Sequence, residues 1–114
     1  SGPYDWGTVL DSLPTLTRET FRVRSHSTNE EEARLLSLKF SLKGVAQEIT
    51  CPIFIVAGKL DRLISYKDAE RLAAEVSGPV ELLIIEDGNH VANNRAYRYR
   101  LQTADWMAEQ LENL

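Results

Sequence analysis

The sequence predicts an α/β fold in which two parallel strands are joined by a crossing helix. Two apolar runs rich in β-branched residues, 52–57 and 80–85, have the length and composition of strands buried on both faces. A helical pattern lies between them at about residues 66–76, and another follows at about 97–111. Strand, helix, strand and helix at this spacing form the pattern of a right-handed parallel crossover.

Composition excludes several classes of function. The 114 residues are 43% hydrophobic and 26% charged, which is typical of one globular domain or a piece of one. The net charge is −4 and no Lys/Arg stripe forms, so we expect no nucleic-acid partner. No apolar stretch approaches the roughly 18 residues of a membrane span, and no leader opens the chain, so we expect no membrane association. The lone Cys51 cannot form an internal disulfide and favours a reducing, cytoplasmic setting.

The first 49 residues are mostly helical in pattern. Thr17, and then Thr28 or Asn29, precede helical stretches and are suitable N-caps. Apolar residues at three- and four-residue intervals over 42–49 predict a further short helix that leads into the first strand.

Two helices cannot bury a two-stranded sheet that is apolar on both faces. The helix between the strands is bounded by Ser65, a suitable N-cap, and by Ser77-Gly78-Pro79. Strand 52–57 is therefore expected to pair on its far side with a strand that belongs to a larger sheet or to a second copy of the chain. The opening Ser1–Gly7 has no initiator Met and no capping signal, and we interpret it as the turn just past the end of a strand that lies upstream.

Each predicted strand is followed by a loop that ends in a titratable side chain. Gly58-Lys59-Leu60-Asp61 follows the first strand, and Asp87-Gly88-Asn89-His90 follows the second. Because neighbouring parallel strands lie about 4.8 Å apart and end at one edge of the sheet, we expect the Asp61 carboxylate to contact the His90 imidazole. An acid that orients a histidine forms two-thirds of a nucleophile–base–acid relay, in which His90 acts first as general base and then as general acid.

Alternative interpretations of these residues stay open. Asp61 is also a favoured turn residue that caps the next helix, and His90 in a polar turn is also typical of surface structure. On that interpretation the chain is a non-catalytic α/β interaction module that self-associates as a homodimer through its open strand edge. Arg62 could lower the pKa of Asp61, while Asp68 is a weaker candidate for the acid because it falls inside the helix.

No other residue carries a strong functional signal. His26 is expected in an exposed loop, and Cys51 is expected to be buried and inert. No metal-ligand spacing, dinucleotide- or phosphate-binding loop or Gly-x-Ser-x-Gly elbow occurs, so we expect neither a metal nor a cofactor. Apolar and aromatic residues near the start predict either core packing or a lid over an apolar acyl pocket: Tyr4, Trp6, Leu10, Leu13 and Phe21.

These segments resemble the C-terminal part of an α/β-hydrolase. Residues 51–61, Cys-Pro-Ile-Phe-Ile-Val-Ala-Gly-Lys-Leu-Asp, resemble the segment that carries the acid of that superfamily, and residues 84–90, Ile-Ile-Glu-Asp-Gly-Asn-His, resemble its histidine segment. The opening Ser-Gly-Pro-Tyr-Asp, the Glu-Glu-Ala-Arg at 31–34 and the last helix are similar to one subgroup, that of the fermentation/respiration switch esterase-like and dihydropseudooxynicotine hydrolase-like proteins.

The resemblance implies a fold, a reaction and a site. Residues 1–41 correspond to the end of a strand plus a helical cap, and residues 42–114 to the C-terminal part of the core. Asp61 corresponds to the triad acid and His90 to the triad base of a serine hydrolase, which cleaves an ester, or a carbon–carbon bond beside a ketone, in a small-molecule substrate. The nucleophile and the oxyanion-hole amides belong to an N-terminal half that is missing from this sequence, so we expect this chain alone to be inactive.

Overall fold

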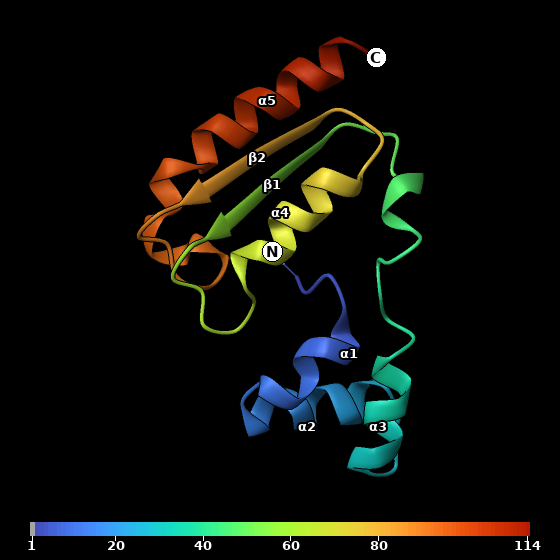
Figure 1. Cartoon of the computed structure of the whole chain (residues 1–114). Coiled ribbons are helices and arrows are strands. Elements are labelled where there is room, and N and C mark those ends of the chain that lie inside the picture. The colour runs from blue at the N-terminus through green and yellow to red at the C-terminus, as the bar shows by residue number, and fades with distance from the viewer. Residues whose placement is uncertain (1) are drawn as a thin grey trace.

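The computed structural model describes residues 2–114, whose elements form two groups (Figure 1). The first group comprises α1 (Trp6–Val9), the 3₁₀ turn η1 (Leu10–Ser12), α2 (Thr15–Arg24) and α3 (Glu30–Ser37). The second comprises the 3₁₀ turn η2 (Ala46–Glu48), β1 (Ile53–Gly58), α4 (Tyr66–Glu75), β2 (Val80–Ile85), the 3₁₀ segment η3 (His90–Arg98) and α5 (Arg100–Glu112). Ser1, which we assigned to the turn just past the end of a strand, lies outside the described residues. No helix of residues 2–114 has both the length and the apolar character needed to cross a bilayer.

The strands β1 and β2 pair in parallel along their whole length, as predicted. Alternate side chains of β1 point to opposite faces of the sheet. Ile55 and Ala57 pack with Ala69 of α4 on one face. On the other face Phe54 meets Trp106 of α5 edge-on, with ring centroids 5.5 Å apart. The helices α4 and α5 therefore cover opposite faces of the sheet, as Figure 1 shows.

Within residues 2–114 the sheet has no third strand, so the outer edge of β1 stays open. A groove of about 220 Å³ runs beside β1 and is lined partly by Tyr4 and Leu42. The prediction that both strands are buried on both faces is wrong for β2 and holds only in part for β1, where Ile53, Phe54 and Val56 are half-buried. Val80 and Leu82 are each 38% exposed, because one helix on each face does not cover the first half of an edge strand.

Two of the predicted N-caps are present. The Oγ of Ser65 accepts a hydrogen bond from the N–H of Lys67 at 3.2 Å and begins α4. The Oδ1 of Asn29 accepts from the N–H of Glu32 at 2.8 Å and begins α3, so Asn29 and not Thr28 is the cap. Each cap satisfies an N–H group that has no partner inside its helix.

Other helix predictions need correction. The helix α2 begins before Thr17, because the carbonyl of Pro14 already accepts the N–H groups of residues 17 and 18. The predicted helix over 42–49 is only the short turn η2. Gly44 takes a positive φ of 78° just before it, a conformation that breaks a right-handed helix.

The two groups of elements are joined by two chain segments that lie side by side. The N–H of Trp6 donates to the carbonyl of Phe40, and the N–H of Leu42 donates to the carbonyl of Tyr4, each at 2.9 Å. We call residues 5–41 the helical segment and residues 42–114 the sheet region. The radius of gyration is 15.7 Å, against about 13 Å for a compact domain of this length, because the helical segment extends away from the sheet (Figure 1).

Candidate active site

The loops after β1 and β2 touch through their backbones at the carboxyl edge of the sheet. A Cβ atom on Gly58 would lie 2.1 Å from the carbonyl oxygen of Asn89 and 2.4 Å from that of Gly88. Only a glycine leaves room for this approach. The N–H of Leu60 also donates to the Gly88 carbonyl at 2.9 Å. The two loops are therefore held together by the main chain, independently of their polar side chains.

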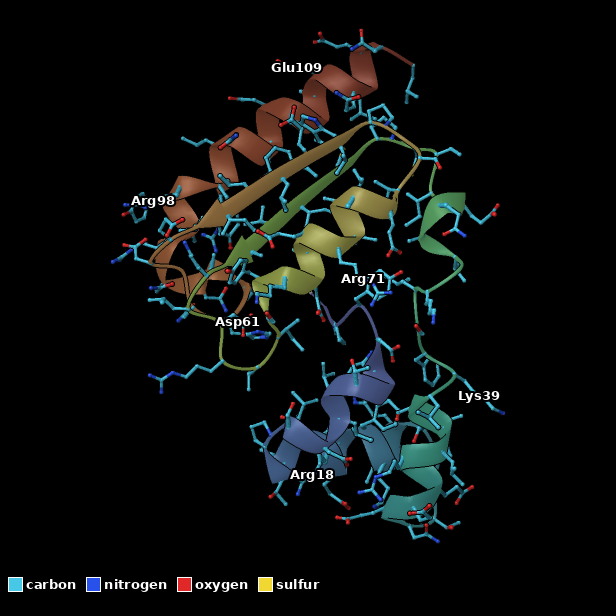
Figure 2. All side chains as sticks on the ribbon, in the orientation of Figure 1. Arg18, Lys39, Asp61, Arg71, Arg98 and Glu109 are labelled. Carbon is cyan, nitrogen blue, oxygen red and sulfur yellow. The ribbon has the colours of Figure 1, made fainter. Side chains whose placement is uncertain are left out.

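The carboxylate of Asp61, labelled in Figure 2, lies in the first of these loops. Its side chain is only 2% exposed. One oxygen accepts hydrogen bonds from the N–H groups of Leu63 and Ile64 at 2.8 and 2.9 Å, and the other lies 2.9 Å from Nδ1 of His90. Burial is the largest influence and raises the pKa of Asp61, but the hydrogen bonds from Ile64, His90 and Leu63 together outweigh it and hold the pKa below its ordinary value.

The expected contact between the acid and the histidine is thus present, and it defines the state of the imidazole. An ionised carboxylate has no hydrogen to donate, so Nδ1 of His90 carries the hydrogen and donates a hydrogen bond to Asp61. In the neutral ring the lone pair is then on Nε2, which has no hydrogen-bond partner among residues 2–114. The His90 side chain is 42% exposed. This is the arrangement of a general base whose tautomer is set by a buried acid.

The chain leaves His90 through a turn with unusual backbone angles. Val91 and Ala92 both have positive φ, 51° and 53°. A left-handed conformation in a residue other than glycine costs on the order of 1–3 kcal/mol, and such residues cluster at functional sites. Ala92 is fully buried, and its N–H donates to the carbonyl of Asn89 at 2.9 Å. The buried Ala92 therefore anchors the turn and leaves His90 at the surface.

Neither Asp68, the other candidate acid, nor the neighbouring cation Arg62 takes part in the Asp61–His90 contact. Asp68 accepts a hydrogen bond from the N–H of Tyr4 at 2.9 Å and is engaged in holding the start of the chain. Arg62 is exposed and forms no ion pair with Asp61 in the described part of the chain. The expectation that Arg62 lowers the pKa of Asp61 is wrong. The hydrogen bonds from Ile64, His90 and Leu63 lower it instead.

His26 and Cys51 take no part in this site. His26 is exposed, as predicted, and has a φ of 58° at the end of α2, where its N–H donates to the carbonyl of Val23. It forms the left-handed C-terminal cap of that helix. Cys51 is exposed, so the prediction that it is buried is wrong. It lies in the loop before β1 and not inside the strand.

The apolar residues near the start of the chain do not form one cluster. Trp6 stacks on Phe21 with ring centroids 5.0 Å apart, and Phe21 meets Phe40 edge-on at 6.2 Å. These three rings line a hollow of about 330 Å³ in the helical segment. Tyr4 packs instead on α4, where the Arg71 guanidinium lies 3.9 Å from its ring centroid. Two further members are buried beneath the helical segment's own surface: Leu10 and Leu13.

Sequence reasoning misses the residues that support the Asp61–His90 pair. Gly58 and Gly88 were noted as loop residues, but their backbone contact was not predicted. A glycine near the end of each apolar run was the available signal. Among residues 2–114 no group of three or more His, Cys, Asp or Glu side chains is arranged to hold a metal ion.

Comparison with known proteins finds hydrolases that are similar to this chain. No family model matches the chain. It is 33% identical over 115 residues to the 2,6-dihydropseudooxynicotine hydrolase of Paenarthrobacter nicotinovorans, a match that covers 93% of this chain and 30% of the relative. The crystal structure of the 2,6-dihydroxy-pseudo-oxynicotine hydrolase superposes with a TM-score of 0.76 at 29% identity and covers 89% of this chain and 30% of that one. A hydrolase from Pseudomonas aeruginosa superposes with a TM-score of 0.48 at 18% identity, over 96% of this chain and 40% of that one.

Proposed function

We propose that this chain, which is related to the α/β-hydrolases and has the fold of part of one, supplies the acid and the base of a serine hydrolase's catalytic triad. Asp61 is the acid and His90 is the base. The observation that carries the proposal is the 2.9 Å contact between Asp61 Oδ2 and His90 Nδ1 at the carboxyl edge of two parallel strands. The chain spans 30% of the length of the hydrolase it matches, so the remaining groups come from the rest of a longer protein.

The chemistry follows from the two nitrogens of the His90 ring. Nε2 takes the proton from a serine hydroxyl as that oxygen attacks the substrate, and later returns it to the leaving group. Nδ1 keeps its hydrogen bond to Asp61, whose charge stabilises the imidazolium that forms. The serine and the oxyanion-hole amides are assigned to an N-terminal half that pairs with the open edge of β1.

The proposed substrate is a small molecule with an ester, or with a carbon–carbon bond beside a ketone. The name of the 2,6-dihydropseudooxynicotine hydrolase that the chain matches supports hydrolysis of a small molecule. The helical segment serves as a cap over residues 42–114. Its two ends meet where Asp5 bridges Ser41, as expected of a unit inserted into a core. The aromatic hollow beside Trp6 contributes an apolar pocket wall. A cytoplasmic setting belongs to the same proposal and is supported by the single unpaired Cys51.

Hydrolysis of p-nitrophenyl esters by the whole protein and by this chain tests the proposal. We expect turnover by the whole protein only, with a loss of about 10⁴-fold in kcat for Asp61→Asn and a comparable loss for His90→Ala. Turnover by the 114-residue chain that depends on His90, or a whole protein indifferent to both substitutions, would contradict the proposal. Asn93→Ala, a substitution at an exposed position close to His90 in sequence, is the matched control.

The open edge of β1 favours a second candidate, a non-catalytic module that self-associates through this edge. Sedimentation of the purified chain separates the two. A stable homodimer together with a whole protein lacking hydrolase activity would support the module. A monomer at high concentration would exclude it.

A further inference from the structure

One side chain, Asn94, ties the turn that follows His90 back to the residues that precede it. The Oδ1 of Asn94 accepts a hydrogen bond from the N–H of Asn89 at 2.8 Å. Its Nδ2 donates to the carbonyl oxygen of Asp87 at 2.9 Å. Its own N–H donates to Oδ1 of Asn89 at 3.3 Å. A single amide side chain therefore satisfies one backbone donor and one backbone acceptor just before the histidine.

This cross-link closes only over an unusual backbone. Between Asn89 and Asn94 the chain passes through Val91 and Ala92, both in the left-handed region. Left-handed conformations persist in such residues only when the surrounding structure enforces them. The turn is held by the Asn94 side-chain hydrogen bonds, by the Asn89 side chain that accepts the Asn94 N–H, and by the buried Ala92, whose N–H donates to the Asn89 carbonyl. If the cross-link is removed, the turn is free to relax and the His90 backbone moves with it.

The far end of the cross-link is itself fixed by ion pairs. Nε of Arg95 donates to one carboxylate oxygen of Asp87 at 2.7 Å, and Nη1 of Arg98 donates to the other at 3.1 Å. Arg95 and then Arg98 outweigh burial and hold the pKa of Asp87 below its usual range, so the carboxylate is charged at neutral pH. Figure 2 labels Arg98 at this end of the sheet. Asp87, whose carbonyl accepts the hydrogen bond from Asn94, is thus held by two arginines of η3, the element that also contains Asn94.

We propose that Asn94 is the positioning residue that keeps the His90 imidazole on the Asp61 carboxylate. Asn94 touches neither ring nor carboxylate, and acts through the main chain on both sides of His90. Its importance for a reaction rests on the proposed function, in which His90 is the base. The effect of Asn94 on the His90 ring does not depend on the proposed function, because the tautomer of His90 is a property of the folded chain alone.

The test is a measurement of the His90 tautomer by long-range ¹H–¹⁵N NMR on the 114-residue chain at neutral or slightly alkaline pH. Bonding to Asp61 favours the Nδ1–H tautomer, whereas a histidine in water favours Nε2–H. We expect Nδ1–H to dominate in the wild type, to fall to the minor form in Asn94→Ala, and to stay dominant in Asn93→Ala. Asn93 is the matched control, since it is exposed and its side chain makes no hydrogen bond among residues 2–114. A wild-type tautomer in a folded Asn94→Ala chain would overturn the proposal.

A second variant, Asn94→Asp, tests the proposal if Asn94→Ala does not fold. If Asn94→Ala gives no dispersed amide spectrum, Asn94→Asp decides the matter, because it keeps the acceptor for the Asn89 N–H and loses the donor to the Asp87 carbonyl. We expect an intermediate tautomer ratio, and an unchanged ratio would overturn the proposal.

Activity of the whole protein separates this inference from the proposed function. If the proposed function is right, Asn94→Ala lowers kcat by roughly 10²-fold with little change in KM. If His90→Ala leaves activity intact, the proposed function fails, while the tautomer comparison still decides the role of Asn94.

Discussion

The contacts inside the sheet region differ in kind from those inside the helical segment. At the edge of the sheet, the backbones at Gly58 and Gly88 touch and the Asp61–His90 hydrogen bond joins residues 29 positions apart. In the helical segment, the Arg22–Glu19 ion pair connects adjacent turns of one helix. The stacked rings of Trp6 and Phe21 and the exposed Arg34–Asp11 ion pair join different elements there through side chains. Contacts between residues near in sequence build helices, whereas contacts between distant residues build the candidate site.

The two regions meet at Tyr4, which is 3% exposed. Its N–H donates to Asp68, its hydroxyl donates to Glu75, and its ring lies under Arg71. These contacts connect α4 to the residue just before the helical segment. Each region also contains one tryptophan, Trp6 in the helical segment and Trp106 in α5, so Trp→Phe variants allow the unfolding of each to be followed separately by fluorescence.

The largest effect is expected from Gly58→Ala. The added Cβ would meet two backbone carbonyl oxygens that cannot rotate away, so we expect a loss of about 3 kcal/mol in the free energy of unfolding, at the upper end for overpacking. Urea unfolding monitored by Trp106 in a Trp6→Phe background measures it. Gly2→Ala, where a Cβ meets nothing within 4 Å, is the control. Equal stability of the two variants would show that the loops do not need their close approach.

The next effect is expected at the junction of the two regions. Asp68→Ala leaves the N–H of the buried Tyr4 without its carboxylate partner, and the loss of such a bond costs about 2 kcal/mol. Both tryptophan reporters should register it, because the contact joins the two regions. Glu70→Ala on the exposed side of the same helix is the control. A change seen by Trp106 alone would argue against this junction.

A smaller and more local effect is expected from Asn29→Ala. The substitution removes the N-cap of α3 and should cost about 1 kcal/mol. We expect Trp6 to report lower stability while Trp106 reports little change. Equal shifts at both reporters would mean that the two regions unfold as one unit, despite the different contacts that hold each of them.

The smallest effect near neutral pH is that of Asp61 titration. The pKa of Asp61 is lowered by folding, so the unfolded chain binds more protons in acid. The stabilisation by the carboxylate is complete above the unfolded value of about 4 and is lost as the pH falls through the lower folded value. The stability of wild type relative to Asp61→Asn should therefore decrease as the pH falls below about 4. Asn93→Ala, which keeps Asp61, should follow the wild-type curve. A flat difference between wild type and Asp61→Asn down to pH 2 would contradict the lowered pKa.

The strand pair and the dyad were predictable because each depends on a local pattern. The run 80–85 is strand β2 within its predicted bounds, and Ser65 caps the next helix as its position indicated. Parallel neighbouring strands end at one edge, so the contact of Asp61 with His90 followed from the order of the elements. The roles of the two residues in a reaction remain part of the proposal.

The corrections to burial share a cause, since each concerns how elements far apart in the sequence cover one another. Cys51 and Val80 are both exposed because burial depends on which helix lies over a residue. The predicted helix over 42–49 has the right apolar spacing, but Gly44 breaks it.

The sequence by itself determined the parallel strand pair, the helix that crosses between the strands and the two loops that carry an acid and a histidine. Periodicity and turn residues act over a few positions, so they can be recognised without coordinates. Only the tertiary structure decided that Gly58 and the Gly88 backbone touch, and that Asn94 cross-links the turn around His90. Such contacts depend on the path of the main chain in space, which no local pattern specifies.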